Sequence, residues 1–264
     1  MKYITKKQIK LPKRKRTSKK GDNGRVLIIG GSKDYVGCLA LAGLAALRTG
    51  VDWVTIAAPE KVAWAINCLS PDLVTKKVKG EYFTLRHYTD IIKLTQKFDA
   101  VLIGNGIGTK KSTALFVNKI TKHLSKPVVI DADALKLIRI QNTHHAIFTP
   151  HKKEYEVLMK NSAVSNVKKV LFDSVIILKG SIDKIITRDH TYYNKTGNEG
   201  MTKAGTGDVL AGLCVGFLAQ TKNILQSAIN ATYINGLVGD ILLKKKKGYS
   251  YIASDLVEEI KRLI

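Results

Sequence analysis

The sequence lacks the features that mark membrane and secreted proteins. None of its 264 residues lies in an apolar run that approaches the roughly 20 residues needed to cross a bilayer. No apolar segment follows the basic N-terminus, so we expect neither a membrane span nor a secretory signal. The only cysteines, Cys38, Cys68 and Cys214, are widely spaced and form no CxxC pair. This predicts reduced, buried thiols in a cytoplasmic protein, not a disulfide framework or a zinc site.

Acidic residues are absent from the first 20 residues, which carry ten of the basic ones. The formal net charge of the chain is +23, a value that raises the question of nucleic-acid binding. Beyond Tyr3 this segment has no aromatic residue that could stack on a base, which favours a solvated leader over an RNA-binding segment. We expect residues 1–22 to form a basic arm, residues 23–264 to form one domain, and no nucleic acid as partner.

The remaining pattern predicts an α/β fold. Hydrophobic residues make up 45% of the chain, enough for one sizeable core. From Gly24 onward, short runs rich in Val and Ile alternate with helical stretches, which is typical of a mostly parallel sheet flanked by helices on both faces. The predicted strands are Val26 to Ile29, Trp53 to Ala57, Ala100 to Ile103, Val128 to Ile130, Ala146 to Phe148 and Val175 to Leu178. A hairpin of Lys184 to Thr187 and His190 to Tyr193 follows, then helices over Asp208 to Ala219, Ile224 to Lys244 and Ser254 to Leu263.

A run of four lysines, Lys244 to Lys247, follows the second of these helical patterns. It fits a helix C-terminus, where the helix dipole favours cations.

Glycine and polar residues follow five of the predicted strands. Ligands of open α/β sheets bind outside the carboxyl ends of the strands, so we expect these segments to converge on one cleft. They are Gly30 to Ser32, Gly104 to Gly108, Asp131, Thr149 to His151, and Lys179 with Gly180.

The strongest chemical signal is the turn Gly205-Thr206-Gly207-Asp208, which precedes an apolar helical pattern. The two glycines let the backbone wrap an anion, and the unpaired N–H groups of a helix N-terminus can hold phosphate oxygens. Asp208 in the first turn could then take a proton from a hydroxyl bound beside that phosphate. The alternative is that Asp208 only caps the helix, since Asp is a preferred capping residue.

Several motifs surround this turn in a characteristic order. They are Gly24 to Gly37, a small-residue helix up to Gly50, Pro127 to Leu135 (PVVIDADAL), Phe148 to Glu154 (FTPHKKE), Ile177 to Gly180 (ILKG), Gly197 to Gly200 (GNEG), and, near the C-terminus, Ala253 to Leu256. In this order they resemble the ADP- or ATP-dependent NAD(P)H-hydrate dehydratase family, a branch of the ribokinase-like superfamily. The resemblance excludes the first twenty residues. Some members carry an epimerase domain in front, which we do not expect here.

The resemblance implies a ribokinase-like fold and a repair reaction. A hydrated nicotinamide nucleotide would be phosphorylated on its ring hydroxyl by ADP or ATP with Mg²⁺, and phosphate would then be eliminated to restore NADH or NADPH. Asp208 would be the catalytic base and would contact the substrate. The implied nucleotide-binding residues are Lys179, Gly180, Ser181, Ile182, Asp183, Asn198, Ala204, Gly205, Thr206 and Gly207.

The resemblance also implies substrate contacts by Cys38, Gly106, His151 and Glu154. Capping of a helix is the alternative for His151. Asp131 or Asp133 could bind the metal or substrate hydroxyls, although Asp133 could equally cap a helix. Three residues depart from the family pattern: Val36 replaces a small residue, Cys38 stands where Ala is usual, and Asn105 stands where Pro is frequent.

Two other functions remain open from the sequence. A vitamin-precursor or sugar kinase of the same superfamily needs a similar anion site and base, since fold alone does not fix function. An RNA-binding protein using the basic arm is the other. The sequence does not decide between ADP and ATP or between the two hydrates, but the TPH motif that holds His151 resembles the ADP-dependent branch. Family members often form tetramers, so we expect a homo-oligomer.

Overall fold

A computed structural model of the chain describes residues 1–246 and 248–264. Its centre is a ten-stranded sheet in the order β1-β10-β9-β8-β7-β6-β5-β2-β3-β4. The strands are β1 (Lys2–Tyr3), β2 (Arg25–Ile29), β3 (Trp53–Pro59), β4 (Val74–Val78), β5 (Ala100–Ile103), β6 (Val128–Ile130), β7 (Ala146–Phe148), β8 (Val175–Leu178), β9 (Asp183–Ile186) and β10 (Thr191–Asn194). All neighbouring pairs are parallel except β8 with β9 and β9 with β10.

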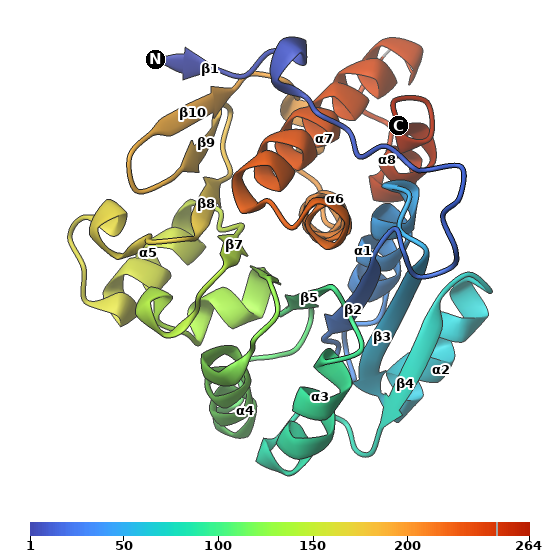
Figure 1. Cartoon of the computed structure of the whole chain (residues 1–264), viewed down its shortest axis with the longest axis vertical. Coiled ribbons are helices and arrows are strands. Elements are labelled where there is room, and N and C mark those ends of the chain that lie inside the picture. Colours follow the sequence, from blue (N-terminus) through green and yellow to red (C-terminus); the bar gives the residue numbers. More distant parts are fainter. Residues whose placement is uncertain (247) are drawn as a thin grey trace.

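Within the described residues, eight α-helices cover both faces of this sheet (Figure 1). They are α1 (Gly37–Arg48), α2 (Glu60–Leu69), α3 (Tyr88–Thr95), α4 (Lys111–His123), α5 (Lys152–Ser162), α6 (Thr206–Thr221), α7 (Ile224–Lys246) and α8 (Ala253–Ile260). Val26 and Ile28 of β2 pack in one core with α1, α6, α7 and α8, while Leu27 and Ile29 pack in a second core with α3, α4 and α5. The strand is therefore buried on both faces, as its unbroken apolar run indicates. The prediction of an α/β fold with helices on both faces is confirmed.

The chain order of the strands creates a switch point in the sheet. From β2 the chain continues through β3 and β4 toward one edge, and then returns to place β5 on the other side of β2. Ligands of open α/β sheets bind where the strand order reverses in this way. The crevice beyond the carboxyl ends of β2 and β5 is therefore the expected ligand site.

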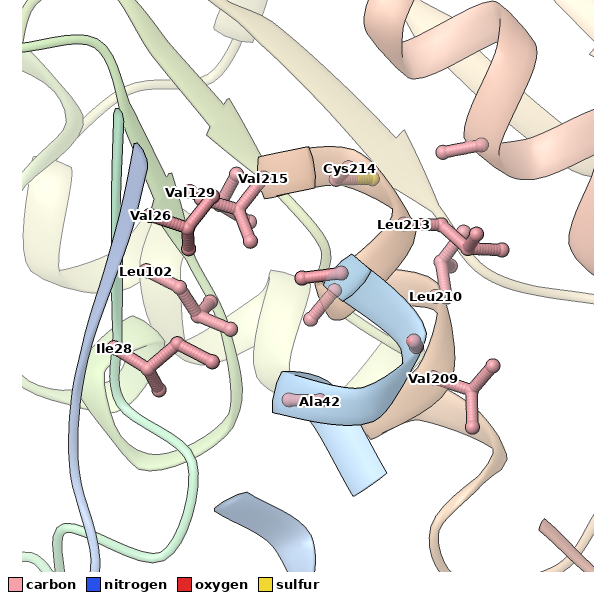
Figure 2. Packing of buried hydrophobic residues seen from close by; sticks show 14 of the residues in the cluster. Val26, Ile28, Ala42, Leu102, Val129, Val209, Leu210, Leu213, Cys214 and Val215 are labelled. Atoms are coloured by element: carbon pink, nitrogen blue, oxygen red, sulfur yellow. The ribbon is translucent and has the colours of Figure 1, made fainter. Parts of the chain in front are cut away.

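Helix α6 lies against the centre of the sheet because small residues let it approach α1 closely. A Cβ atom on Gly212 would lie 2.2 Å from the carbonyl oxygen of Ala42, so this position requires glycine. Figure 2 shows Val215 of α6 facing Val26 and Val129 of the sheet. The helix is apolar on nearly all sides, as expected of a fully buried element. Its N-terminus is thereby held over the carboxyl ends of the central strands.

The two outermost strands, β1 and β4, are not predicted by the sequence pattern. Strand β4 reads VTKKV, and most of its side chains are exposed or half-buried. Strand β1 has two residues. Edge strands need no apolar run, so the signal that identifies the central strands is missing. The predicted hairpin is confirmed as β9 and β10 with its limits shifted by one residue.

The basic arm is not a solvated leader over its first residues. Strand β1 pairs with β10, Ile4 is 7% exposed, and Ile9 and Leu11 pack against the core beside α7. The backbone of Lys10 exchanges two hydrogen bonds with the side chain of Asn230, at 3.1 and 2.8 Å. Figure 1 shows this dark blue segment crossing α7 before it enters β2. The apolar Ile4, Ile9 and Leu11, alternating with the cations, anchor the arm.

Deleting residues 2–11 is expected to lower the free energy of unfolding by about 2 to 4 kcal/mol, the usual worth of one or two buried aliphatic side chains. Turnover per folded molecule should not change, because every predicted site motif begins at Gly24 or later. Urea unfolding and steady-state kinetics on the same variant test both statements. Loss of turnover in a folded, correctly assembled variant would show that the domain begins before residue 23.

Two further expectations concern single residues. The prediction of buried thiols holds for Cys214, holds only in part for the half-buried Cys38, and is wrong for Cys68, which is exposed in the last turn of α2. The cationic end of α7 is confirmed through Lys246, whereas Lys247 lies outside the described residues. Among the described helices, none is long and apolar enough to cross a membrane.

Candidate active site

The segments after five neighbouring strands meet at one edge of the sheet, as the sequence predicts. The N–H of Gly31 after β2 donates to the carbonyl of Asn105 after β5, at 2.9 Å. The N–H of Lys179 after β8 donates to the carbonyl of Pro150 after β7, also at 2.9 Å. Between them, Asp131 after β6 lies beside Asn105 on one side and Thr149 on the other.

The GTGD turn forms the start of α6. Gly205 has a left-handed backbone with φ 92°, which glycine adopts without strain. The hydroxyl of Thr206 donates to the carbonyls of Met201 and Lys203, at 2.8 and 2.9 Å, and so fixes the turn. The N–H of Thr206 donates to the carbonyl of Lys203 at 3.4 Å. Helix geometry leaves the next two N–H groups, of Gly207 and Asp208, without intrahelical partners, so they are available to an anion.

Asp208 does not cap this helix. The residue at the cap position is Gly205, and no side chain makes a capping hydrogen bond there. Instead, Oδ1 of Asp208 accepts a hydrogen bond of 2.6 Å from Nδ2 of Asn105. Within the described part of the chain, Oδ2 of Asp208 has no hydrogen-bond partner, which leaves one carboxylate oxygen for a ligand.

The protonation of Asp208 is tuned to near-neutral pH. Burial, with a smaller contribution from the negative charge of Asp131, raises its pKa to about 6, although the amide of Asn105 and the ammonium of Lys179 oppose the rise. A base with a pKa near the working pH both holds and releases a proton readily. Asp208 therefore has the location and the pKa of a general base.

Lys179 lies beside the helix N-terminus and places a cation at the site. A Cβ atom on Gly207 would be 3.4 Å from its Nζ, which therefore borders the first turn of α6. Burial alone would lower the pKa of Lys179, but Asp131 and Glu154 outweigh it and hold the pKa above its ordinary value. Lys179 is therefore charged, and its Nζ lies 3.4 Å from Oδ1 of Asp131.

A cavity of about 620 Å³ opens beside these groups. It has the size of a small-molecule binding site. Seven of the predicted nucleotide-binding residues line it: Lys179, Gly180, Ser181, Asp183, Asn198, Thr206 and Gly207. Ile182, Ala204 and Gly205 adjoin them in sequence but do not line the cavity, and Ile182 is exposed.

The predicted substrate residues divide into two groups. His151 lines the cavity and also caps α5, because its Nδ1 accepts from the N–H of Glu154 at 3.2 Å. The Glu154 carboxylate accepts from the N–H of His151 at 3.0 Å and is buried, so the capping alternative is realised for this pair. Cys38 and Gly106 contact each other in the switch-point crevice, where a Cβ on Gly106 would lie 2.8 Å from Sγ of Cys38.

Asp131 and Asp133 do not fit a metal centre as they stand. Both oxygens of Asp131 are engaged, by Thr149 at 2.6 Å and Lys179 on one side and by Asn105 at 2.8 Å on the other. The Asp133 oxygens accept from the N–H of Gly108 at 3.0 Å and from Lys136 at 2.8 Å. No group of three potential metal-ligating side chains occurs among the described residues.

Two residues of the site have no role in the sequence prediction. Asn105 is completely buried and bridges Asp131 and Asp208. Asn235 of α7 lines the cavity, is 8% exposed, and has a buried Oδ1 atom without a partner among the described residues. The sequence did mark Asn105 in one way, because it stands where the family frequently has Pro. For Asn235 no such signal exists, because α7 also buries the polar residues Ser227, Asn230 and Thr232.

Comparison with known proteins gives close relatives. The profile of the NAD(P)H-hydrate dehydratase family matches residues 26–262. A bifunctional NAD(P)H-hydrate repair enzyme of Methanocaldococcus jannaschii is 43% identical over 96% of this chain, which spans about half (50%) of that protein. An ADP-dependent (S)-NAD(P)H-hydrate dehydratase of Nitrosopumilus maritimus is 33% identical over 95% of this chain and 91% of its own.

Solved structures agree with the sequence relatives. A ribokinase-like superfamily protein of Enterococcus faecalis superposes with a TM-score of 0.84, at 24% identity, over 99% of this chain and 94% of its own. The ADP/ATP-dependent NAD(P)H-hydrate dehydratase of Bacillus subtilis, co-crystallized with ATP/Mg²⁺, gives a TM-score of 0.79 at 26% identity, over 96% of this chain and 93% of its own. The fold is thus ribokinase-like, and the chain belongs to the NAD(P)H-hydrate dehydratase family.

Proposed function

We propose that this protein returns hydrated NADH or NADPH to the reduced nucleotide by using ADP or ATP to phosphorylate the ring hydroxyl and then eliminating phosphate. One observation carries the proposal. Asp208, with a pKa raised to about 6 and one free carboxylate oxygen, lies in the first turn of the helix whose N-terminus borders the cavity. A proton acceptor and an anion site are thereby adjacent.

The first step is phosphoryl transfer. Asp208 takes the proton of the ring hydroxyl as the hydroxyl oxygen attacks the terminal phosphorus of ADP or ATP. The bond from that phosphorus to the rest of the donor nucleotide breaks. The N–H groups at the start of α6 and the ammonium of Lys179 stabilise the negative charge on the transferred group. Lys179 is a compact point charge suited to phosphate.

The second step is elimination. The ring carbon–oxygen bond breaks, and phosphate leaves with the bonding electrons and the former hydroxyl oxygen. The neighbouring carbon loses its proton to water, and the C–H electron pair forms the ring double bond. Hydroxide is a poor leaving group, so phosphorylation divides one difficult step into two easier ones. The donor nucleotide is released with one phosphate fewer, and the reduced nicotinamide ring is restored.

The cavity suits the phosphate-donor nucleotide. Its lining includes the polar side chains of Lys179 and Asn198, which suit phosphates, and the apolar side chains of Leu210 and Met201, which suit a base. The name of the Nitrosopumilus relative favours ADP as donor, and the Bacillus relative is described as ADP/ATP-dependent. We propose ADP as the usual donor, with Mg²⁺ accompanying the nucleotide phosphates. The homo-oligomeric state and cytoplasmic location stay predictions.

A coupled assay tests this function against the kinase alternative. Hydrated NADH is incubated with ADP or ATP, and both the near-ultraviolet absorbance of reduced nicotinamide and free phosphate are followed. The proposal predicts equimolar formation of NADH and phosphate. A phosphorylated product that accumulates without a rise in absorbance would instead establish a kinase, as would turnover of a vitamin precursor or sugar alone.

Activity should depend on pH through Asp208. The base must be ionised, so kcat/KM is expected to fall tenfold per pH unit below the pKa of about 6 and to level off above it. Initial rates at subsaturating hydrate from acid to neutral pH measure this limb. An acid limb near the ordinary Asp pKa of 3.8 would show that the free enzyme does not use this carboxylate in its buried state.

A further inference from the structure

The amide of Asn105 is shared between two carboxylates. Nδ2 donates to Oδ2 of Asp131 at 2.8 Å and to Oδ1 of Asp208 at 2.6 Å. Ionised carboxylates only accept hydrogen bonds, so the amide nitrogen must face them and the orientation of the side chain is fixed. The Oδ1 atom then lies buried without a partner among the described residues, an arrangement that costs about 1 to 3 kcal/mol. The two hydrogen bonds that the nitrogen donates to Asp131 and Asp208 explain why so costly an orientation is kept.

The two bridged carboxylates have unequal numbers of other partners. Asp131 is 2% exposed and has donors on both of its oxygens. Asp208 receives a donor on Oδ1 only. The charged or titratable groups around Asp208 are Asp131, Lys179 and the thiol of Cys38, whose pKa burial raises to about 12. Cys38 is therefore neutral, and the net influence on Asp208 comes from one anion, one cation and one amide.

We propose that Asn105 is a positioning residue for the phosphoryl-transfer step, which holds Asp208 ionised beside Asp131 and directs its free oxygen toward the substrate hydroxyl. The inference rests on the proposed function. Without the amide, the two carboxylates would lie close together with no donor between them, and one would take up a proton. That proton would go to Asp208, because Asp131 keeps Thr149 and Lys179 as partners.

The test replaces Asn105 with Leu, which has a similar shape and no donor. The acid limb of kcat/KM is expected to move upward by about one pH unit or more, the shift a lost hydrogen bond to a carboxylate produces. Much of the lost activity should therefore return at alkaline pH. A purely structural role predicts a loss that is equal at all pH values, and that outcome would overturn the inference.

A matched control is Asn118→Leu. The Asn118 amide also makes two hydrogen bonds, to the carbonyls of Ala114 and Leu137, but it lies on α4 away from the site. This variant should lose stability without moving the acid limb. If Asn105→Leu does not fold, Asn105→Ser is the second variant, because the shorter hydroxyl cannot bridge both carboxylates.

A second readout separates this inference from the proposed function. Carbon-13 NMR of labelled Asp carboxyls, with the Asp208 signal identified by its loss in Asp208→Asn, follows the titration without any turnover. The inference predicts a higher pKa of Asp208 in the Asn105 variant than in the wild type. An unchanged pKa would refute it even if hydrate repair occurs, and a raised pKa would support the bridge even if the substrate is a different hydroxyl compound.

Discussion

Asp208→Asn is expected to lower turnover about a hundredfold or more while folding and nucleotide binding survive, because Asn keeps the size of Asp but cannot accept a proton. The variant should not melt at a lower temperature. The folded-state pKa of about 6 lies above the ordinary 3.8, so the ionised carboxyl opposes folding at neutral pH, and this penalty fades as pH falls from 6 toward 3.8. A neutral amide removes the penalty at every pH.

The measurements are kcat for hydrate repair and the melting temperature at neutral pH. Leu210, in the same helix and lining the cavity, offers a steric control as Leu210→Met, which should alter donor binding without a comparable loss of kcat. Asp208→Asn with turnover within a few-fold of the wild type and an unaltered melting temperature would refute the assignment of Asp208 as base.

Lys179→Met should raise the KM for ADP and ATP about tenfold or more, since a charged hydrogen bond to phosphate contributes roughly 1.5 to 3 kcal/mol. The KM for hydrated NADH should change much less. Met keeps the length of the side chain and removes its charge, so Asp131 loses a partner and the pKa of Asp208 rises. Both changes follow from one ammonium group bordering α6.

The control for this variant is Lys184→Met, on the exposed side of neighbouring strand β9 and outside the cavity lining. It should leave all kinetic constants unchanged. Equal KM values for the donor nucleotides in Lys179→Met and the wild type, with activity intact, would remove Lys179 from the nucleotide site.

The central part of the fold could be predicted because its signal is local. Strands β2, β5, β6 and β7 are buried on both faces and therefore appear as continuous apolar runs. The edge strands β1 and β4 give no such run, and anchoring of the arm depends on contacts such as that between Lys10 and Asn230, 220 residues apart. Local patterns contain no information on such pairs.

The same distinction applies to the site. Two site motifs could be predicted because each places a glycine next to a charged side chain: the GTGD turn with Asp208, and Lys179 with Gly180. The cavity lies between these motifs. The role of Asn105 depends on partners 26 and 103 residues further along the chain. The amide gives no periodic pattern, so its function becomes visible only when the strand ends converge.

The fate of the ring hydroxyl oxygen tests the proposed chemistry most directly. Hydrated NADH is prepared with a heavy oxygen isotope in the hydroxyl and turned over with unlabelled ADP in ordinary water, and the released phosphate is examined by mass spectrometry. Our account predicts one heavy oxygen in each phosphate released, because the phosphorylated oxygen leaves with phosphorus. Phosphate without the label, formed as NADH is restored, would show that the hydroxyl leaves as water and that no phosphorylated intermediate exists.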